Sequence, residues 1–236
     1  MMGKLLRVEL MKIRRKGFWF LTFLGPIGVV ALQVVNYSVR WDYLRTLSDD
    51  HWLFYLENVS GFTPLALVLG IAILTSFMAS IENETNAWKQ LLALPVRKTS
   101  VYLAKFTVLS GLLFLASVLL CLATLVYGLT LDFGGGVPII ELLEYSFYPF
   151  FAALPILALQ LWVAMVSENQ GWPITVGVLN VILTYSAFSL PDWAFWKWPT
   201  LLNSWEEPMY SGLMGLGVGL VIYMVGMMDF VRRDVK

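Results

Sequence analysis

Six long apolar segments separated by short polar connections dominate the hydrophobic pattern of this chain. Windows of about 20 residues place them at 18–37, 62–81, 106–129, 147–166, 172–190 and 211–230. None contains Lys, Arg or Glu, and the only acidic residue is Asp229, at the boundary of the last segment. A helix of about 20 residues rises about 30 Å, the thickness of a bilayer's hydrocarbon core, so each segment is long enough to span. The pattern predicts an all-α membrane protein with six transmembrane helices.

The basic residues are distributed unevenly among the connections. Of the 16 Lys and Arg residues, 13 lie before the first segment, in the second connection or after the last segment, and the fourth connection has none. The alternate connections hold only Arg40, Arg45 and Lys197. The positive-inside rule therefore predicts that both termini are cytoplasmic, although the net charge of the chain is zero.

Composition narrows the class of protein further. The connections within the 236 residues are too short to hold a second folded domain, so we expect one transmembrane domain over 1–236. The only cysteine, Cys121, lies inside the third segment, and the only histidine, His51, lies in the first connection. No phosphate-binding loop of the Gly-x-x-x-x-Gly-Lys type is present, so no catalytic residue, metal ligand or bound cofactor is indicated for this chain. ATP hydrolysis would require a separate chain, and no nucleic-acid partner is expected.

The first 17 residues combine apolar positions at helical spacing with basic ones. Leu6, Leu10 and Ile13 recur on one face, whereas lysines and arginines occupy much of the remaining surface. Such a helix is suited to the inner headgroup layer, with its basic side chains toward anionic lipid. We therefore expect an interfacial helix over 1–17 and membrane lipid as a partner.

The second connection contains a short amphipathic pattern that is too polar to span. Trp88, Leu91, Leu92 and Pro95 fall on one face of a helix, which Asn83 or Thr85 can cap and Pro95 can end. The apolar face has nothing within a polar loop to bury against. It either lies on the membrane or docks on another protein.

The same connection carries a sequence motif, Glu82 followed by Trp88-Lys89-Gln90-Leu91-Leu92-Ala93-Leu94-Pro95. With its six segments and basic N-terminal helix, the chain resembles the permease subunits of ABC-2 type exporters. It is most similar to the small permeases of lantibiotic self-immunity and related peptide-exporting systems, in which the Glu-x-x-x-x-x-Trp-Lys-x-Leu-x-x-Leu-Pro pattern recurs. The resemblance implies a bacterial cytoplasmic membrane protein.

The resemblance also implies partners and contact residues. Residues 83–94 would form a cytoplasmic coupling helix seated in a cleft of a separate ABC ATPase, which would bind ATP and Mg²⁺. A second permease copy or a paralogous permease would complete the pathway. The aromatic, proline-broken stretch 190–209 would form an outer re-entrant element at the headgroup level. The candidate ATPase contacts are Glu82, Glu84, Trp88, Lys89, Leu91 and Leu92.

Polar side chains within the segments are uncharged, and four of them are candidates for lining a pathway: Gln33, Asn36, Gln160 and Asn180. Each can instead hydrogen-bond to a neighbouring helix, the commoner use of such residues. Pro155, interior to the fourth segment, is expected to bend it. The Gly-x-x-x-Gly pair at Gly215 and Gly219 permits close helix approach, more often within the chain than between chains.

A pathway without charged residues favours an amphipathic or apolar cargo. The leading hypothesis is therefore a permease that moves an amphipathic peptide, such as a lantibiotic or a toxin, out of the membrane for self-protection. Drug or sodium efflux and a non-transporting scaffold or sensor subunit are the alternatives. An integral-membrane enzyme would need His, paired carboxylates or a positioned nucleophile at membrane depth, and the segments contain none of these.

Overall fold

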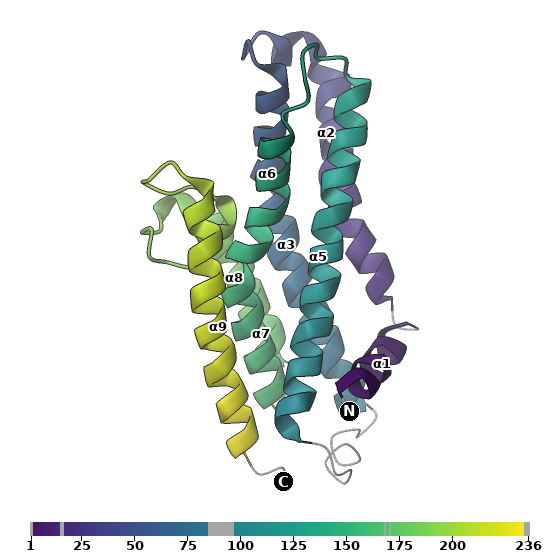
Figure 1. The fold of residues 1–236 in the computed structure, drawn as a ribbon, viewed down its shortest axis with the longest axis vertical. Helices are drawn as coiled ribbons and strands as arrows, with labels where there is room; N and C mark the ends of the chain where they lie inside the picture. The colour runs from purple at the N-terminus through teal and green to yellow at the C-terminus, as the bar shows by residue number, and fades with distance from the viewer. Residues whose placement is uncertain (1, 15–16, 85–96, 168, 170, 234–236) are drawn as a thin grey trace.

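The computed structural model describes residues 2–14, 17–84, 97–167, 169 and 171–233. Every regular element within these ranges is helical, which confirms the all-α class, and the long helices stand side by side in an elongated bundle (Figure 1). The helices are α1 (Met2–Ile13), α2 (Phe18–Arg45), α3 (His51–Glu84), α5 (Lys98–Thr130), α6 (Ile139–Ala152), α7 (Leu154–Val166), α8 (Gly171–Tyr185) and α9 (Pro208–Arg232), with the short 3₁₀ turns η1 (Ala187–Ser189) and η2 (Trp198–Thr200).

Five helical stretches among the described residues are long and apolar enough to cross a membrane. They are Phe18–Arg45, His51–Ile81, Lys98–Thr130, Ile139–Val166 and Pro208–Arg232, and they contain the first, second, third, fourth and sixth predicted segments. The fifth segment forms α8, a helix of 15 residues. At 1.5 Å per residue α8 is about 22 Å long, shorter than the hydrocarbon core. A sixth full span is therefore not confirmed.

The helix of the fifth segment ends at Tyr185, earlier than its hydropathy suggests. After α8 the chain tightens into η1, and Leu190 then becomes extended, with φ −89° and ψ 145°. Leu190 precedes Pro191, whose ring disfavours helical dihedrals in the residue before it. The apolar residues up to Leu190 therefore continue the hydrophobic pattern without continuing the helix.

The fourth segment is broken near Pro155, as its sequence predicts. The helices α6 and α7 meet at Ala153, and Pro155 occupies the first turn of α7, where its missing N–H costs nothing. The last helix packs against this break: a Cβ added to Gly215 would collide with the carbonyl oxygen of Phe151, and one added to Gly219 would lie 2.9 Å from Leu154 Cβ. The Gly-x-x-x-Gly pair therefore packs within the chain, as expected.

The distal end is the end of the bundle opposite the two termini. At this end the helices continue well past the predicted segments. There α2, α3, α5 and α6 share a hydrophobic cluster separate from the main core. Phe133, in the turn between α5 and α6, lies at its centre, stacked on Trp41 and edge-on to Trp52. The Trp52 ring in turn lies directly against Gly128. The first connection is therefore mostly helix, with only a short turn between Arg45 and His51.

The two termini lie at the opposite end, together with the end of α3 and the start of α5 (Figure 1). Lys98, the first residue of α5, donates hydrogen bonds from Nζ to the carbonyl oxygens of Arg233 (2.7 Å) and Val231 (3.4 Å). Asp229, the acid at the edge of the last segment, accepts hydrogen bonds from Trp162 Nε1 (2.9 Å) and Arg233 Nε (3.2 Å). This terminal end is where the predicted topology requires the termini and the second connection to meet.

Candidate functional site

The predicted ATPase contacts divide between described and undescribed residues. Glu82 and Glu84 belong to the last turn of α3, which ends at Glu84, so the helix predicted to begin at residue 83 has no separate start there. Trp88, Lys89, Leu91 and Leu92 lie outside the described residues. The structure thus places the two flanks of the predicted coupling segment, Glu84 and Arg97, at the terminal end of the bundle.

Beside these flanks, α1 is fastened to α5 by a buried ion pair. Lys105 is fully buried, and its Nζ lies 3.3 Å from Glu9 Oε2. Lys12, one turn along α1, lies 2.8 Å from Glu9 Oε1. The sequence pattern predicted an apolar face of Leu6, Leu10 and Ile13. Ile13 is buried, but Leu10 is exposed and Glu9 is buried in its place.

The charge of Glu9 is stabilised at this position. Burial by itself raises the pKa of the carboxyl, but the ammonium groups of Lys105 and Lys12 outweigh it, so the pKa lies below its ordinary value. Glu9 is therefore a carboxylate near neutral pH, and it compensates the positive charge of Lys105 inside the protein. The helix α1 is in this way tied to the first turns of α5, the helix that follows the predicted coupling segment.

Two of the predicted pathway residues, Gln160 and Asn180, form a buried chain of hydrogen bonds. Gln160 Nε2 donates to the carbonyl oxygen of Pro173 (2.7 Å), and Asn180 Nδ2 donates to Gln160 Oε1 (3.0 Å). Trp196 Nε1, from the aromatic stretch, donates to Asn180 Oδ1 (2.9 Å). Both amides are almost fully inaccessible. The chain of hydrogen bonds therefore connects α7, the first turn and the middle of α8, and the loop after α8.

The other two candidates, Gln33 and Asn36, lie on α2. Gln33 is buried, and its Nε2 donates to the carbonyl oxygen of Asn58 on α3 (2.9 Å), while its Oε1 has no hydrogen-bond partner in the part of the chain that the structure describes. Asn36 is half-buried one turn further along α2. These two residues are on a different part of the bundle from Gln160, and the structure does not bring the four candidates into one site.

An apolar groove runs between α3 and α8, with a volume of about 440 Å³. It is lined by Leu69, Ala72, Ile73, Ser76, Phe77, Ala79, Ser80, Pro173, Ile174, Gly177, Val178, Val181 and Ile182. Gly177 makes the close contact possible, because a Cβ there would lie 2.7 Å from Ala72 Cβ and 3.2 Å from Gln160 Nε2. The amide of Gln160 therefore lies directly behind the wall of this groove. The hydroxyl of Ser76 faces it without a hydrogen-bond partner among the described residues.

A family model described as ABC-2 family transporter protein matches residues 5–186. The chain belongs to this family. No curated protein and no solved structure matched the chain. In ABC-2 transporters the membrane chain is the transport subunit and is not itself catalytic; it normally works with an ABC ATPase subunit. Within the described ranges of this ABC-2 permease, no three His, Cys, Asp or Glu side chains gather where a metal ion could bind.

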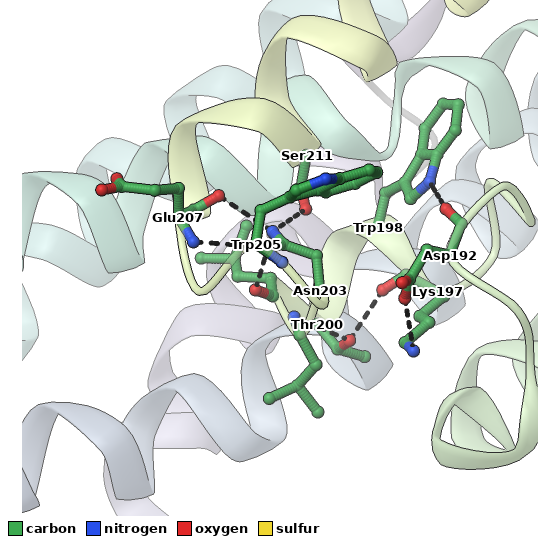
Figure 2. Close-up of polar contacts among 10 residues, drawn as sticks. Asp192, Lys197, Trp198, Thr200, Asn203, Trp205, Glu207 and Ser211 are labelled. Carbon is green, nitrogen blue, oxygen red and sulfur yellow. Dashed lines mark hydrogen bonds and ion pairs between the residues drawn. The ribbon is translucent and has the colours of Figure 1, made fainter.

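The aromatic loop, residues 190–207, follows the matched region and is compact (Figure 2). Lys197 Nζ lies 2.7 Å from Asp192 Oδ1, and Trp198 Nε1 donates to the Asp192 carbonyl oxygen (2.6 Å). The ammonium of Lys197, together with a hydrogen bond from Ser204, holds the pKa of Asp192 below its ordinary value. The loop therefore closes on itself through one acidic residue.

Asn203 fixes the second half of the aromatic loop to the start of α9 (Figure 2). Its Nδ2 donates to the carbonyl oxygen of Glu207 (2.9 Å) and to Ser211 Oγ (3.1 Å), and its Oδ1 accepts from the Trp205 N–H (3.1 Å). On either side of Asn203 in the sequence, Leu201 (φ 60°) and Glu206 (φ 57°) adopt left-handed backbone dihedrals that residues other than glycine seldom take. Hydropathy identified the loop as aromatic but contained no signal for this polar framework.

Proposed function

We propose that this chain is the permease subunit of an ATP-driven exporter that removes an amphipathic peptide, such as a lantibiotic or related toxin, from the membrane and so protects the host cell. Membership of the ABC-2 family supports the transport role. The observation that carries the choice of cargo is the groove between α3 and α8, in which no charged residue belongs to the lining that the structure describes. A groove of this kind accepts the apolar face of a peptide already dissolved in the lipid.

The same observation weighs against sodium efflux. A sodium ion, like other hard cations, is held by several oxygen ligands, whereas the described lining of the groove includes no polar side chain except those of Ser76 and Ser80. An apolar drug would fit the groove as well as a peptide does. Drug efflux is therefore the second candidate function, and a non-transporting scaffold or sensor subunit is the outcome to expect if no cargo moves.

In this proposal Gln160 and Asn180 hold the pathway wall from behind, since the Gln160 amide packs against Gly177 on the groove. Gln33 and Asn36 would contact cargo, if at all, at a separate point on α2. Glu82 and Glu84 would lie where α3 meets the ATPase, and Trp88, Lys89, Leu91 and Leu92 would enter its cleft. ATP and Mg²⁺ would bind the ATPase, and this chain would hold no cofactor.

We further propose a bacterial cytoplasmic membrane location with both termini in the cytoplasm and a second permease subunit, identical or paralogous, beside this one. The basic residues support the orientation, because the termini and the flanks of the second connection lie at one end of the bundle (Figure 1). Orientation and ATPase docking then require the same end to face the cytoplasm.

The experiment that tests the function is peptide tolerance in cells. Cells that express this permease with its ATPase should tolerate a higher concentration of the cognate peptide than cells whose ATPase lacks its catalytic glutamate. A panel of lantibiotics and related peptides supplies the cargo, and a panel of apolar drugs tests the second candidate. Equal tolerance to every peptide, with a difference for one drug, would replace the peptide proposal with drug efflux.

A further inference from the structure

A second and larger cavity, with a volume of about 840 Å³, lies toward the distal end, between α3, α6 and the aromatic loop. Its wall includes Glu57 on α3, Tyr145 on α6, Thr184 near the end of α8, and Leu201 and Glu206 of the aromatic loop. The volume is within the range of sites that bind drug-sized molecules, about 300–1,000 Å³. Neither the family match nor the apolar groove accounts for this cavity.

One polar group in its wall is buried without a partner. Thr184 is 3% exposed, and its Oγ1 has no hydrogen-bond partner among the described residues. Threonines within helices usually satisfy this oxygen on the carbonyl one turn back, as Thr63 and Thr75 do here. Thr184 lines the cavity wall, and its buried hydroxyl oxygen makes no such bond among the described residues. A ligand at this wall would supply the missing hydrogen bond.

The charge of the wall is negative. Among the described lining residues Lys197 is the only basic one, and its Nζ lies 2.7 Å from Asp192 Oδ1, which neutralises it. Glu57 and Glu206 are exposed to the cavity, and neither forms an ion pair within the described part of the chain. A ligand that enters this space therefore meets two uncompensated carboxylates around an apolar and aromatic surface that includes Tyr185, Phe188 and Leu202.

We propose that this cavity binds an organic cation with an apolar body, and that it receives the cationic part of the amphipathic cargo after the apolar groove. The role of the cavity in transport rests on the proposed export function, whereas the binding of an organic cation to the cavity does not. A metal ion does not fit the observations, because the cavity is far larger than an ion and no three ligating side chains gather in the described residues. An amphipathic cation uses the carboxylates, the aromatic surface and the Thr184 hydroxyl together.

Equilibrium binding to the purified full-length permease in lipid nanodiscs, without ATPase, tests the proposal. The probes are tetraphenylphosphonium and tetraphenylborate, which have nearly the same size and shape but opposite charge. Tetraphenylphosphonium should bind saturably, one per chain, and a cationic amphipathic peptide should displace it, whereas tetraphenylborate should not. Displacement by the peptide assigns the site to cargo; saturable binding without displacement assigns it to small organic cations only and overturns the link to cargo.

Variants distinguish specific binding in the cavity from nonspecific attraction by surface charge. Glu57→Gln and Glu206→Gln should each weaken tetraphenylphosphonium binding about fivefold or more. Glu141→Gln, which removes the same charge from α6 outside the cavity wall, should not. Thr184→Val should weaken binding without lowering the thermal unfolding midpoint, because the hydroxyl has no partner within the described protein to lose.

Equal binding of the two probes, or equal losses in Glu57→Gln and Glu141→Gln, would overturn the proposal. Its failure is distinguishable from failure of the export function. Peptide tolerance with no cation binding would mean that cargo leaves without using this cavity. Cation binding with no peptide tolerance would mean that the cavity serves another organic cation and that the assigned cargo is wrong.

Discussion

At the scale of single residues, the charged and amide side chains that are buried in the bundle are paired across distant parts of the sequence. Lys105 meets Glu9, 96 positions away, and Gln160 meets Asn180, which in turn meets Trp196. The hydrophobic pattern assigned Lys105 to a polar connection because it is charged and adjoins the third segment. A charged side chain tolerates complete burial when it is compensated, as Lys105 is by Glu9 on α1, and no local signal identifies this partner.

Removing the charge of Glu9 should destabilise the protein. Glu9→Gln removes the carboxylate that lies 3.3 Å from the buried ammonium of Lys105, at a cost of about 3 kcal/mol in the free energy of unfolding. Thermal unfolding in detergent measures the loss. Lys12→Met is the control: the Lys12 side chain is 23% exposed, so we expect less than about 1 kcal/mol. The double variant Glu9→Leu with Lys105→Met should recover stability, and a further loss there would contradict the account.

The same carboxyl should give a pH dependence of defined sign. Because the pKa of Glu9 in the folded protein lies below its ordinary value of 4.5, its contribution to stability is fully present above that value. The contribution is lost as the pH falls through the folded pKa. The wild type should therefore lose more stability below about pH 4.5 than Glu9→Gln does, and parallel pH profiles would show that Glu9 is not the carboxylate concerned.

At the scale of helices, the sequence predicted six segments of spanning length, of which five form helices of that length in the described residues, and it placed the break of the fourth near Pro155. It failed for the end of the fifth, because hydropathy follows the apolar residues up to Leu190, whereas the α-helix ends at Tyr185 and the chain continues as a 3₁₀ turn. It also missed the distal cluster, because Trp41 and Phe133 lie in connections whose aromatic contacts depend on the packing of four helices. Features that depend on neighbouring residues could be predicted from the sequence, whereas contacts between distant connections could not.

The glycine face of α9 offers a test of helix packing with a matched control. Gly215→Ala should cost about 2 kcal/mol or more, because its Cβ would meet the rigid backbone of Phe151 and Ala152 rather than a side chain that can move. Gly217→Ala, on the same helix with nothing within 4 Å, should be neutral or slightly stabilising. Thermal unfolding of the two purified variants compares them. Equal midpoints would show that α9 does not pack on the break of the fourth segment in this way.

The predicted coupling helix can be tested by capture of the ATPase. If Trp88 and Leu91 fill a hydrophobic cleft, Trp88→Ala should cost about 2 kcal/mol or more of association. Leu91→Asp should cost more, because an unpaired carboxylate would be buried. Both variants should reach the membrane in normal amounts but lose the ATPase on purification, whereas Gln90→Ala, away from the apolar face, should retain it. Retention of the ATPase by all three would assign this helix to the membrane surface alone.

At the scale of the whole molecule, the fold separates two tasks. The terminal end holds most of the basic residues that the structure describes, the ion pair that ties α1 to α5, and the flanks of the predicted coupling segment. Toward the distal end lie the aromatic loop and the acidic cavity, and the apolar groove runs between α3 and α8. An exporter needs such polarity, because energy enters from the ATPase on one side and cargo leaves on the other.

Transport into inside-out membrane vesicles that contain the permease and its ATPase tests directly whether this chain belongs to a peptide exporter. A fluorescent amphipathic peptide is added with ATP to the outside, which corresponds to the cytoplasm. We expect ATP-dependent accumulation of the peptide inside the vesicles. Leu91→Asp in the permease, or loss of the catalytic glutamate in the ATPase, should abolish it. A bound and active ATPase that drives no accumulation of any peptide in the panel would contradict the proposed function.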